Sequence, residues 1–294
     1  MNSYQISDLV RLTGINAHTL RIWERRYKII EPHRTSTNIR FYDDEQVVKL
    51  LKISTLLNQG MKISKISELS EKQLNSRVNE LEKIAPEDAV CSALINNLTA
   101  SMLTFDEPAF EKVFSSAILR FGLYEAMIKV FYPFLKQTGL MWTYNEAMPV
   151  QEHFATAIIR RKLIVAIDGL PETTKKGKKF LLFLASDEWH ETSLLLSDYI
   201  IRSSGFKTVY LSQNVPLQNL KEVIANTKPT HLLTLYIARQ NMEKIHAEMY
   251  DVAMAHKNCE VLIGGTAAIL KSVKKAKNIT LLNSPVDLIN LLNH

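Results

Sequence analysis

Apolar residues recur at helical spacing through the first 75 residues and are interrupted by one polar, turn-rich loop. The pattern over residues 6–14 predicts a helix that stops at a glycine, and residues 15–27 predict a second helix. Residues 32–38 are rich in turn-forming types, and an aspartate pair then begins a third predicted helix over 43–60. We therefore expect a small helical domain with one projecting loop at residues 1–75.

The middle of the chain is patterned as helices alone. Between residues 80 and 168 the apolar positions keep a helical period, and no alternating strand pattern is found. This pattern predicts a four-helix bundle. The polar stretch 170–179 that follows contains proline, glycine and four lysines, and it is typical of a linker between domains.

After the linker the period changes to short apolar runs that alternate with helical stretches. The runs are Phe180–Ala185, Thr208–Leu211, Leu232–Ile237, Val261–Ile263 and Ile279–Leu282. Strand alternating with helix predicts a parallel, doubly wound, Rossmann-like sheet over residues 178–294, covered on both faces. Ligands bind beyond the carboxyl ends of such strands, so chemistry is expected in the loops near Ser186, Ser212, Ala238 and Gly264. The expected fold class is a multidomain α and α/β protein.

The bulk composition is that of a folded protein, with 46% apolar and 22% charged residues in 294. The two cysteines, Cys91 and Cys259, are too far apart to suggest a disulfide framework or a zinc site, which favours a reducing compartment. The first residues are too polar for a signal peptide, and no apolar run of about 18 residues predicts a membrane span. We expect a cytoplasmic protein that does not bind membranes.

Basic residues gather in the N-terminal block. Residues 16–42 contain six lysines and arginines against two glutamates. A local positive excess suits a polyanion, because neutralising phosphates releases counterions, although the same excess is also found on ordinary solvated surfaces. Helix, glycine turn and helix is the helix-turn-helix order, in which the second helix enters the major groove of DNA.

Eight side chains in this block are candidate DNA contacts. Arginine bonds phosphates and guanine edges through its bidentate fork, and two arginines bracket the loop that would form a wing. Two tyrosines are placed to touch the sugar-phosphate backbone, whereas Trp23 is expected in the core. The candidates are Thr19, Arg21, Arg25, Arg26, Tyr27, Arg34, Arg40 and Tyr42.

The same segment carries a family resemblance. Leu20-Arg-Ile-Trp-Glu-Arg-Arg-Tyr27, Ile-Glu-Pro-His-Arg-Thr35 and Ile39-Arg-Phe-Tyr42 resemble the MerR family of regulators at fixed spacing, in the form found in its CarH/LitR branch. The resemblance implies a winged helix-turn-helix that binds double-stranded DNA at inverted repeats as a dimer. Two departures are Lys28 and Asn38-Ile39, which stand where relatives commonly have glycine.

A histidine follows the first predicted strand of the C-terminal sheet. The loop reads Ser186-Asp-Glu-Trp-His-Glu-Thr-Ser193, and a neutral imidazole there is suited to ligate a transition metal. A carboxylate that bonds the far ring nitrogen strengthens such a ligand, and Asp187 and Glu188 are both near enough in sequence. A histidine in a loop is nevertheless more often an ordinary surface residue.

This loop resembles the cobalamin-binding pattern Asp/Glu-x-His-x-x-Gly, matched by Glu188 and His190 with Ser193 in the glycine place. Thr234 is a weak counterpart of a later serine element, and the pair Gly264-Gly265 corresponds to a glycine pair that lets a flat ligand tail approach the backbone. The resemblance implies that His190 is the lower cobalt ligand of adenosylcobalamin. The glycines alone also fit an ordinary turn.

The bundle carries a second part of the resemblance. Trp142, nine residues and then Glu152-His153 match the signature of the CarH/LitR photoreceptors. The indole offers a flat surface above the corrin, and Glu152 and His153 are suited to hydrogen-bond its adenosyl group. The alternative is a core tryptophan and a helix start. Light-responsive members have a histidine after the tryptophan, whereas this chain has Thr143, whose hydroxyl is a poor cobalt ligand.

The hypothesis is a repressor, not an enzyme, that binds adenosylcobalamin and occupies DNA as a dimer or tetramer, with light breaking the cobalt–carbon bond. The first alternative keeps the DNA reader but gives the C-terminal half an oligomerisation or partner-binding role without a corrin. The second, a corrinoid-shuttling or methyl-transferring enzyme, is disfavoured because no catalytic acid–base pair is evident.

Overall fold

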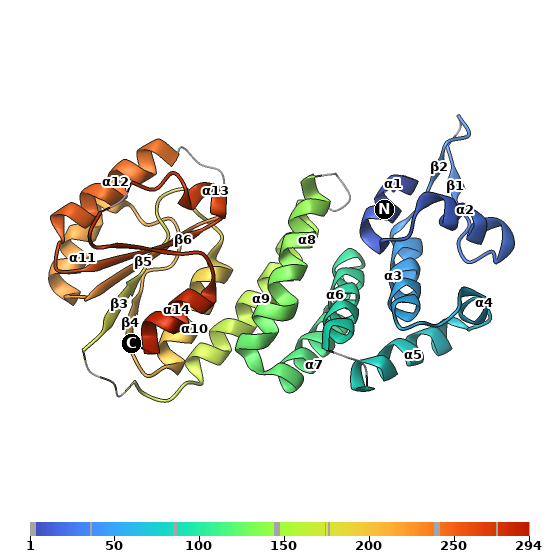
Figure 1. Cartoon of the computed structure of the whole chain (residues 1–294), viewed down its shortest axis with the longest axis horizontal. Coiled ribbons are helices and arrows are strands. Elements are labelled where there is room, and N and C mark those ends of the chain that lie inside the picture. The colour runs from blue at the N-terminus through green and yellow to red at the C-terminus, as the bar shows by residue number, and fades with distance from the viewer. Residues whose placement is uncertain are drawn as a thin grey trace. The chain divides into compact units, whose positions relative to one another are not determined.

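The computed structural model describes the whole chain apart from residues 1–3, 36, 85–86, 144–147, 174, 176, 238–241, 275 and 294. The chain divides into two compact units, Met1–Ile158 and Ile159–His294 (Figure 1). Within the described residues, no helix combines the length and the apolar character that a bilayer crossing demands.

Residues 4–84 of the first unit, which we call the reader, form short helices and one two-stranded hairpin. Its elements are α1 (Ile6–Thr13), α2 (Ala17–Arg26), β1 (His33–Arg34), β2 (Arg40–Phe41), α3 (Asp44–Asn58), α4 (Ile63–Ile66) and α5 (Glu71–Ile84). Gly14 ends α1 in the left-handed conformation with φ of 73°. The Asn16 side chain then caps α2 by accepting from the Thr19 amide at 2.8 Å. These two signals form the tight turn that the sequence predicts.

Asp43 begins α3 through a capping box. Its carboxylate accepts from the Gln46 amide at 2.9 Å, and the Gln46 side chain accepts from the Asp43 amide at 3.1 Å. The prediction of an aspartate cap is therefore confirmed. Leu20 and Trp23 of α2 are buried, as is Leu50 of α3, and the burial confirms Trp23 as a core residue.

Helices fill the rest of the first unit and continue to residue 168. They are α6 (Glu87–Leu103), α7 (Glu107–Ala126), the π-helix η1 (Met127–Phe131), α8 (Tyr132–Thr143) and α9 (Pro149–Asp168). Edge-to-face rings hold the bundle interior together, with centroid distances of 5.8 Å for Phe110–Phe134 and 6.2 Å for Phe110–Phe154. The all-helical character of this region agrees with the sequence pattern.

The second unit is a five-stranded parallel sheet in the order β4-β3-β5-β6-β7. The strands are β3 (Lys179–Leu182), β4 (Lys207–Tyr210), β5 (His231–Tyr236), β6 (Glu260–Gly265) and β7 (Ile279–Leu282). The helices are α10 (Glu191–Ser203), the 3-10 turn η2 (Leu217–Asn219), α11 (Leu220–Thr227), α12 (Met242–Ala255), α13 (Ala267–Leu270) and α14 (Pro285–Asn293). The predicted fold class is confirmed.

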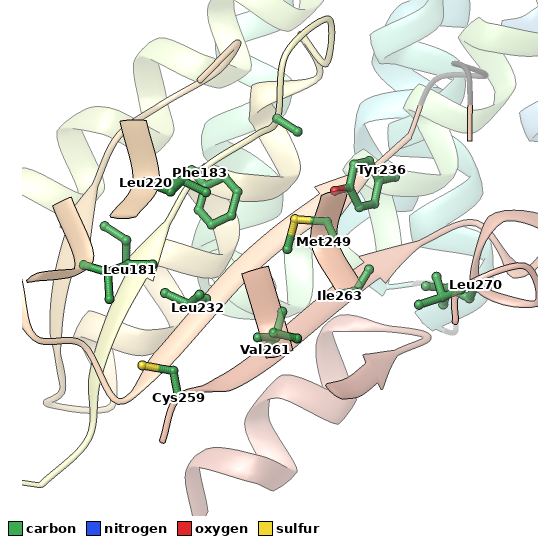
Figure 2. Close-up of a cluster of buried hydrophobic side chains, with 14 of the residues drawn as sticks. Leu181, Phe183, Leu220, Leu232, Tyr236, Met249, Cys259, Val261, Ile263 and Leu270 are labelled. Atoms are coloured by element: carbon green, nitrogen blue, oxygen red, sulfur yellow. The ribbon is translucent and has the colours of Figure 1, made fainter. Parts of the chain in front are cut away.

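Each face of the sheet is covered by helices (Figure 1). On one face, Leu232 and Tyr236 of β5 pack with α11, α12 and α13 in the apolar cluster that Figure 2 shows. Alternate residues of the same strand, such as Leu233 and Leu235, point to the opposite face, on the side of α10 and α14. The carboxyl ends of the strands therefore emerge between two packed layers.

Candidate functional site

The exposed face of α2 carries the basic residues that the sequence singles out. Arg21 and Arg25 are four residues apart and so lie on one side of the helix, and both are exposed, as is Arg26 at its end. The Arg26 guanidinium lies 5.5 Å from the centre of the Tyr27 ring. Thr19 and Tyr27 are partly exposed. A helix that is buried on one side and carries exposed arginines on the other is suited to enter a groove of DNA, where phosphates lie along both edges.

The β1–β2 hairpin forms the predicted wing and presents two arginines. Arg34 pairs directly with Arg40 across the antiparallel ladder, and both side chains are exposed. Arg34 donates to the Asn38 side chain at 2.6 Å, and Arg40 lies 3.8 Å from Glu24 of α2. The hairpin therefore projects a second positive surface beside the reading helix.

The burial of Tyr42 contradicts one of the predicted DNA contacts. Its side chain is fully buried, its backbone bridges to Tyr4, and its hydroxyl donates to Glu24. Burial, with the nearby Glu24 carboxylate, raises the pKa of this hydroxyl. The prediction that the Tyr42 side chain touches DNA is wrong, because the side chain is buried and its hydroxyl binds Glu24 of α2.

The two departures from the family pattern share one backbone property. Lys28 has φ of 51° and Asn38 has φ of 65°, which is the left-handed region that glycine adopts most readily. Asparagine tolerates this region better than lysine, because its short side chain bonds locally. The positions keep the turn geometry that a glycine would give, and Lys28 carries the larger strain.

In the second unit, Glu188 and His190 form a pair at the carboxyl end of β3. The Nδ1 atom of His190 lies 2.6 Å from Oε1 of Glu188. The Glu188 side chain is fully buried, whereas the His190 side chain is 48% exposed. A carboxylate that holds the proton on Nδ1 sets the tautomer and puts the ligating lone pair on Nε2. This arrangement is suited to an axial metal ligand.

Glu188 is itself fixed by the surrounding backbone. Its Oε2 accepts from the Ile237 amide at 2.8 Å, at the end of β5. Its carbonyl accepts from the Asn214 amide at 3.3 Å, in the loop after β4. Of the two acidic residues considered from the sequence, the structure brings Glu188 to the histidine, whereas Asp187 is exposed with φ of 67° and bonds Asn214 through its amide.

Glu191 follows the histidine directly, and the sequence pattern alone does not mark it as a site residue. Its side chain is 5% exposed and accepts from Tyr210 at 3.0 Å and from Ser212 and Arg160. Burial and the Glu191 charge raise the pKa of the Tyr210 hydroxyl. The network ties the start of α10 to α9 and to the end of β4. The signal in the sequence was only an acidic residue in the first turn of a helix.

The other predicted cobalamin residues are distributed over the sheet. Ser193 lies in the first turn of α10 and is partly buried. Thr234 is fully buried in β5, and its hydroxyl has no hydrogen-bond partner among the described residues. Trp189, in the same loop as His190, is 57% exposed. The predicted ligand loop near residue 238 lies outside the described residues.

The glycine pair ends β6 but does not form an open cradle. A Cβ on Gly264 would lie 2.5 Å from Cδ2 of Leu235, and a Cβ on Gly265 would lie 2.6 Å from the Tyr236 carbonyl oxygen. The space that each glycine makes is therefore filled by neighbouring groups of the same chain. A corrinoid fits the Glu188–His190 pair by its donor chemistry, whereas a tail laid on these glycines would have to displace Leu235.

The candidate upper-ligand residues lie on α8 and α9 of the helical region. Glu152 is partly buried and His153 is exposed in the first turns of α9. Trp142 and Thr143 end α8, and their side chains lie outside the described part of the structure. Gln151, beside Glu152, is buried and donates to the Leu103 carbonyl at 3.0 Å, which anchors the start of α9.

No group of three histidine, cysteine or acidic side chains converges on one point within the described residues. The Glu188–His190 pair therefore supplies one axial nitrogen rather than a complete coordination shell. A metal that arrives already held in a macrocycle needs only such an axial ligand from the protein.

Two segments of the chain match known families. Residues 4–73 match the family described as "MerR HTH family regulatory protein", and residues 94–166 match the family described as "B12 binding domain". The first match covers most of the reader, including its wing, and the second covers the helical region from α6 to α9.

Two relatives align along most of the chain. The HTH-type transcriptional repressor CarH of Myxococcus xanthus is 24% identical over 270 residues, covering 90% of this chain and 90% of CarH. The HTH-type transcriptional repressor CarA of the same organism is 23% identical, covering 90% of this chain and 87% of CarA. The monomethylamine corrinoid protein of Methanosarcina barkeri shares the fold, with a TM-score of 0.52 and 15% identity over 68% of this chain and 93% of that protein.

The reading helix, the wing and these matches define a DNA-binding transcriptional regulator with a B12-binding domain. Residues 4–73 match the MerR HTH family, and the chain as a whole is similar to CarH and CarA.

Proposed function

We propose that this chain is a transcriptional repressor whose occupancy of DNA is controlled by adenosylcobalamin, with His190 as the lower axial ligand of the cobalt. The observation that carries the proposal is the Glu188–His190 pair, in which a buried carboxylate orients a half-exposed imidazole at the carboxyl end of a parallel sheet. The B12 binding domain match and the similarity to CarH support a corrinoid as the ligand.

In this proposal His190 would replace the corrinoid's own base, and Glu188 would keep the imidazole in the ligating tautomer. The Ile237 amide holds Glu188 in turn, so the ligand is preorganised by the ends of two strands. Glu152 and His153 at the start of α9, with Trp142 at the end of α8, are proposed to recognise the upper ligand. The bound group supplies a cobalt–carbon bond that light can break.

Control of DNA binding requires a difference in corrinoid affinity between two states of the protein. We propose that the corrinoid-bound chain forms a dimer or tetramer that occupies an inverted-repeat operator through α2 and the wing. Green or blue light would remove the group that Trp142 and Glu152 are proposed to recognise, and its loss would shift this oligomer equilibrium. Thr143 gives no histidine to the upper cobalt position, so the lit state is proposed to lack a second protein ligand.

The test uses the full chain purified with adenosylcobalamin in the dark. The proposal predicts a coloured complex, tighter binding to operator DNA in a mobility shift and a larger species on sizing, each reversed by illumination. His190→Ala is expected to lose the retained corrinoid but to keep basal DNA binding. Dark and lit complexes that are identical in both assays would refute the light response, and a protein that retains no corrinoid would refute the proposal as a whole.

A second candidate function has one observation in its favour. The filled space beside Gly264 fits a regulator whose sheet domain binds no corrin and serves oligomerisation or partner binding. In that case the protein purified with adenosylcobalamin stays colourless, and its oligomeric state and DNA affinity do not respond to the corrinoid.

A further inference from the structure

Three neighbouring strands place Leu235, Gly264 and Leu282 side by side. Gly264 pairs with Leu235 of β5 on one side and with Leu282 of β7 on the other. All three positions share the face of the sheet opposite to the apolar cluster of Figure 2, because residues alternate along each strand. The glycine thus leaves a gap in a row of leucines.

Leu235 closes this gap. Its Cδ2 atom lies 2.5 Å from the point where a Gly264 Cβ would be, and the Leu235 side chain is only 8% exposed. The carbonyl and Cβ of Leu282 lie 3.6 Å and 3.8 Å from the same point. The absence of a side chain at Gly264 is therefore used for packing between strands, and no ligand is needed to explain it.

Gly265 also makes room for neighbouring atoms of the same chain, on the other face of the sheet. A Cβ there would lie 2.6 Å from the Tyr236 carbonyl oxygen and 3.5 Å from Cγ2 of Ile269. A backbone carbonyl belongs to the strand ladder and cannot be moved cheaply. Neither glycine offers an open surface to a flat group.

The Glu188–His190 pair stands apart from this packing. His190 is half exposed in the loop after β3, and Trp189 beside it is more exposed still. The polar and aromatic groups that face solvent are therefore suited to a corrin ring and its cobalt, whereas the glycine end of β6 is closed.

We propose that this chain recognises its corrinoid by the ring, the cobalt and the upper ligand, and that Leu235 excludes the nucleotide tail from the sheet. The ligand class then includes corrinoids that lack the tail. This inference rests on the proposed function, since it assumes that His190 ligates a corrinoid. A tail-less corrinoid also has no base of its own to compete with His190.

The experiment titrates the full chain in the dark with adenosylcobalamin and adenosylcobinamide, which share the ring and the upper ligand and differ in the nucleotide tail. Affinity is followed by the absorption change of the corrinoid. The wild type is expected to bind adenosylcobinamide as tightly as adenosylcobalamin, or more tightly. A wild-type preference for adenosylcobalamin of more than about tenfold would overturn the inference and leave the proposed function standing.

Variants of Leu235 sharpen the result. Leu235→Ala and the milder Leu235→Val remove the atoms that fill the gap, and they are expected to improve binding of adenosylcobalamin relative to adenosylcobinamide by up to about tenfold. Leu233→Ala is the matched control, because Leu233 is buried on the same face of β5 but pairs with Leu262 rather than with Gly264. An equal change of the ratio in Leu233→Ala would contradict the role of Leu235. Binding of neither corrinoid by the wild type would refute the proposed function itself.

Discussion

The DNA reader and the sheet domain differ in how their candidate residues are held. In the reader, one helix and one hairpin carry the exposed arginines, and each is fixed by local signals such as the Asn16 cap. In the sheet domain, the Glu188–His190 pair depends on the Ile237 amide, which is 49 residues away from Glu188 along the chain. The exposed arginines can therefore be predicted from local sequence, whereas the contact between Glu188 and Ile237 depends on how the strands are arranged.

Substitution of Glu188 is expected to have the largest effect, a loss of corrinoid affinity in the sheet domain with no change in the reader. Glu188→Gln keeps an oxygen for the Ile237 amide but loses the carboxylate that orients His190, so corrinoid affinity is expected to fall by about 10–100-fold. DNA binding by the corrinoid-free chain should not change. Titration by absorption gives the affinity, and Asp187→Asn is the control because Asp187 is exposed and asparagine tolerates its positive φ. Equal losses in both variants would contradict the assignment of Glu188.

The reader gives the next largest effect. Arg25→Ala is expected to weaken operator binding by about 1–3 kcal/mol if the side chain reads a base, with no change in corrinoid affinity. If Arg25 instead contacts a phosphate, the salt slope of DNA binding should fall by about 1. Fluorescence anisotropy at several salt concentrations measures both quantities. Arg77→Ala on α5 is the control, since Arg77 is exposed and lies outside α2 and the wing, and a matching loss there would count against α2.

Tyr42→Phe tests the one reader residue that the sequence misassigned. The substitution leaves the Glu24 carboxylate without the hydroxyl that donates to it, so the free energy of unfolding is expected to fall by about 1–2 kcal/mol. Urea denaturation followed by circular dichroism gives this value. Operator affinity should stay within about twofold at a temperature where the domain is folded, and a large loss of affinity at unchanged stability would restore a DNA contact.

The smallest effect is a pH dependence confined to the reader. Burial opposes ionisation of Asp43, but the Gln46 amide and His33 outweigh it, so the pKa of Asp43 is lowered in the fold. A lowered folded pKa adds stability that is present above the ordinary carboxyl pKa and is lost as the pH falls through the folded value. Asp43→Asn should therefore reduce the acid sensitivity of reader unfolding. Parallel stability curves for wild type and variant from neutral to acid pH would contradict this role.

The helices, the parallel strands and the wing could be predicted because periodicity and capping are local signals. The Glu188–His190 pair was also within reach, because its members are two residues apart. The burial of Tyr42, the Glu191 network and the filling of Gly264 by Leu235 could not be predicted, because each depends on residues from separate elements. The glycine pair illustrates this limit, because a glycine that makes room for a ligand and a glycine that makes room for a leucine look the same in the sequence.

The most direct test of cobalt ligation by His190 is electron paramagnetic resonance of the full chain loaded with unlabelled cobalamin in its Co(II) form. The protein is grown with nitrogen-15 histidine. An axial nitrogen-15 splits each cobalt line into two, whereas the nitrogen-14 of the cobalamin's own base splits it into three. Ligation by His190 predicts doublets that disappear in His190→Ala, and triplets in the wild type would contradict it.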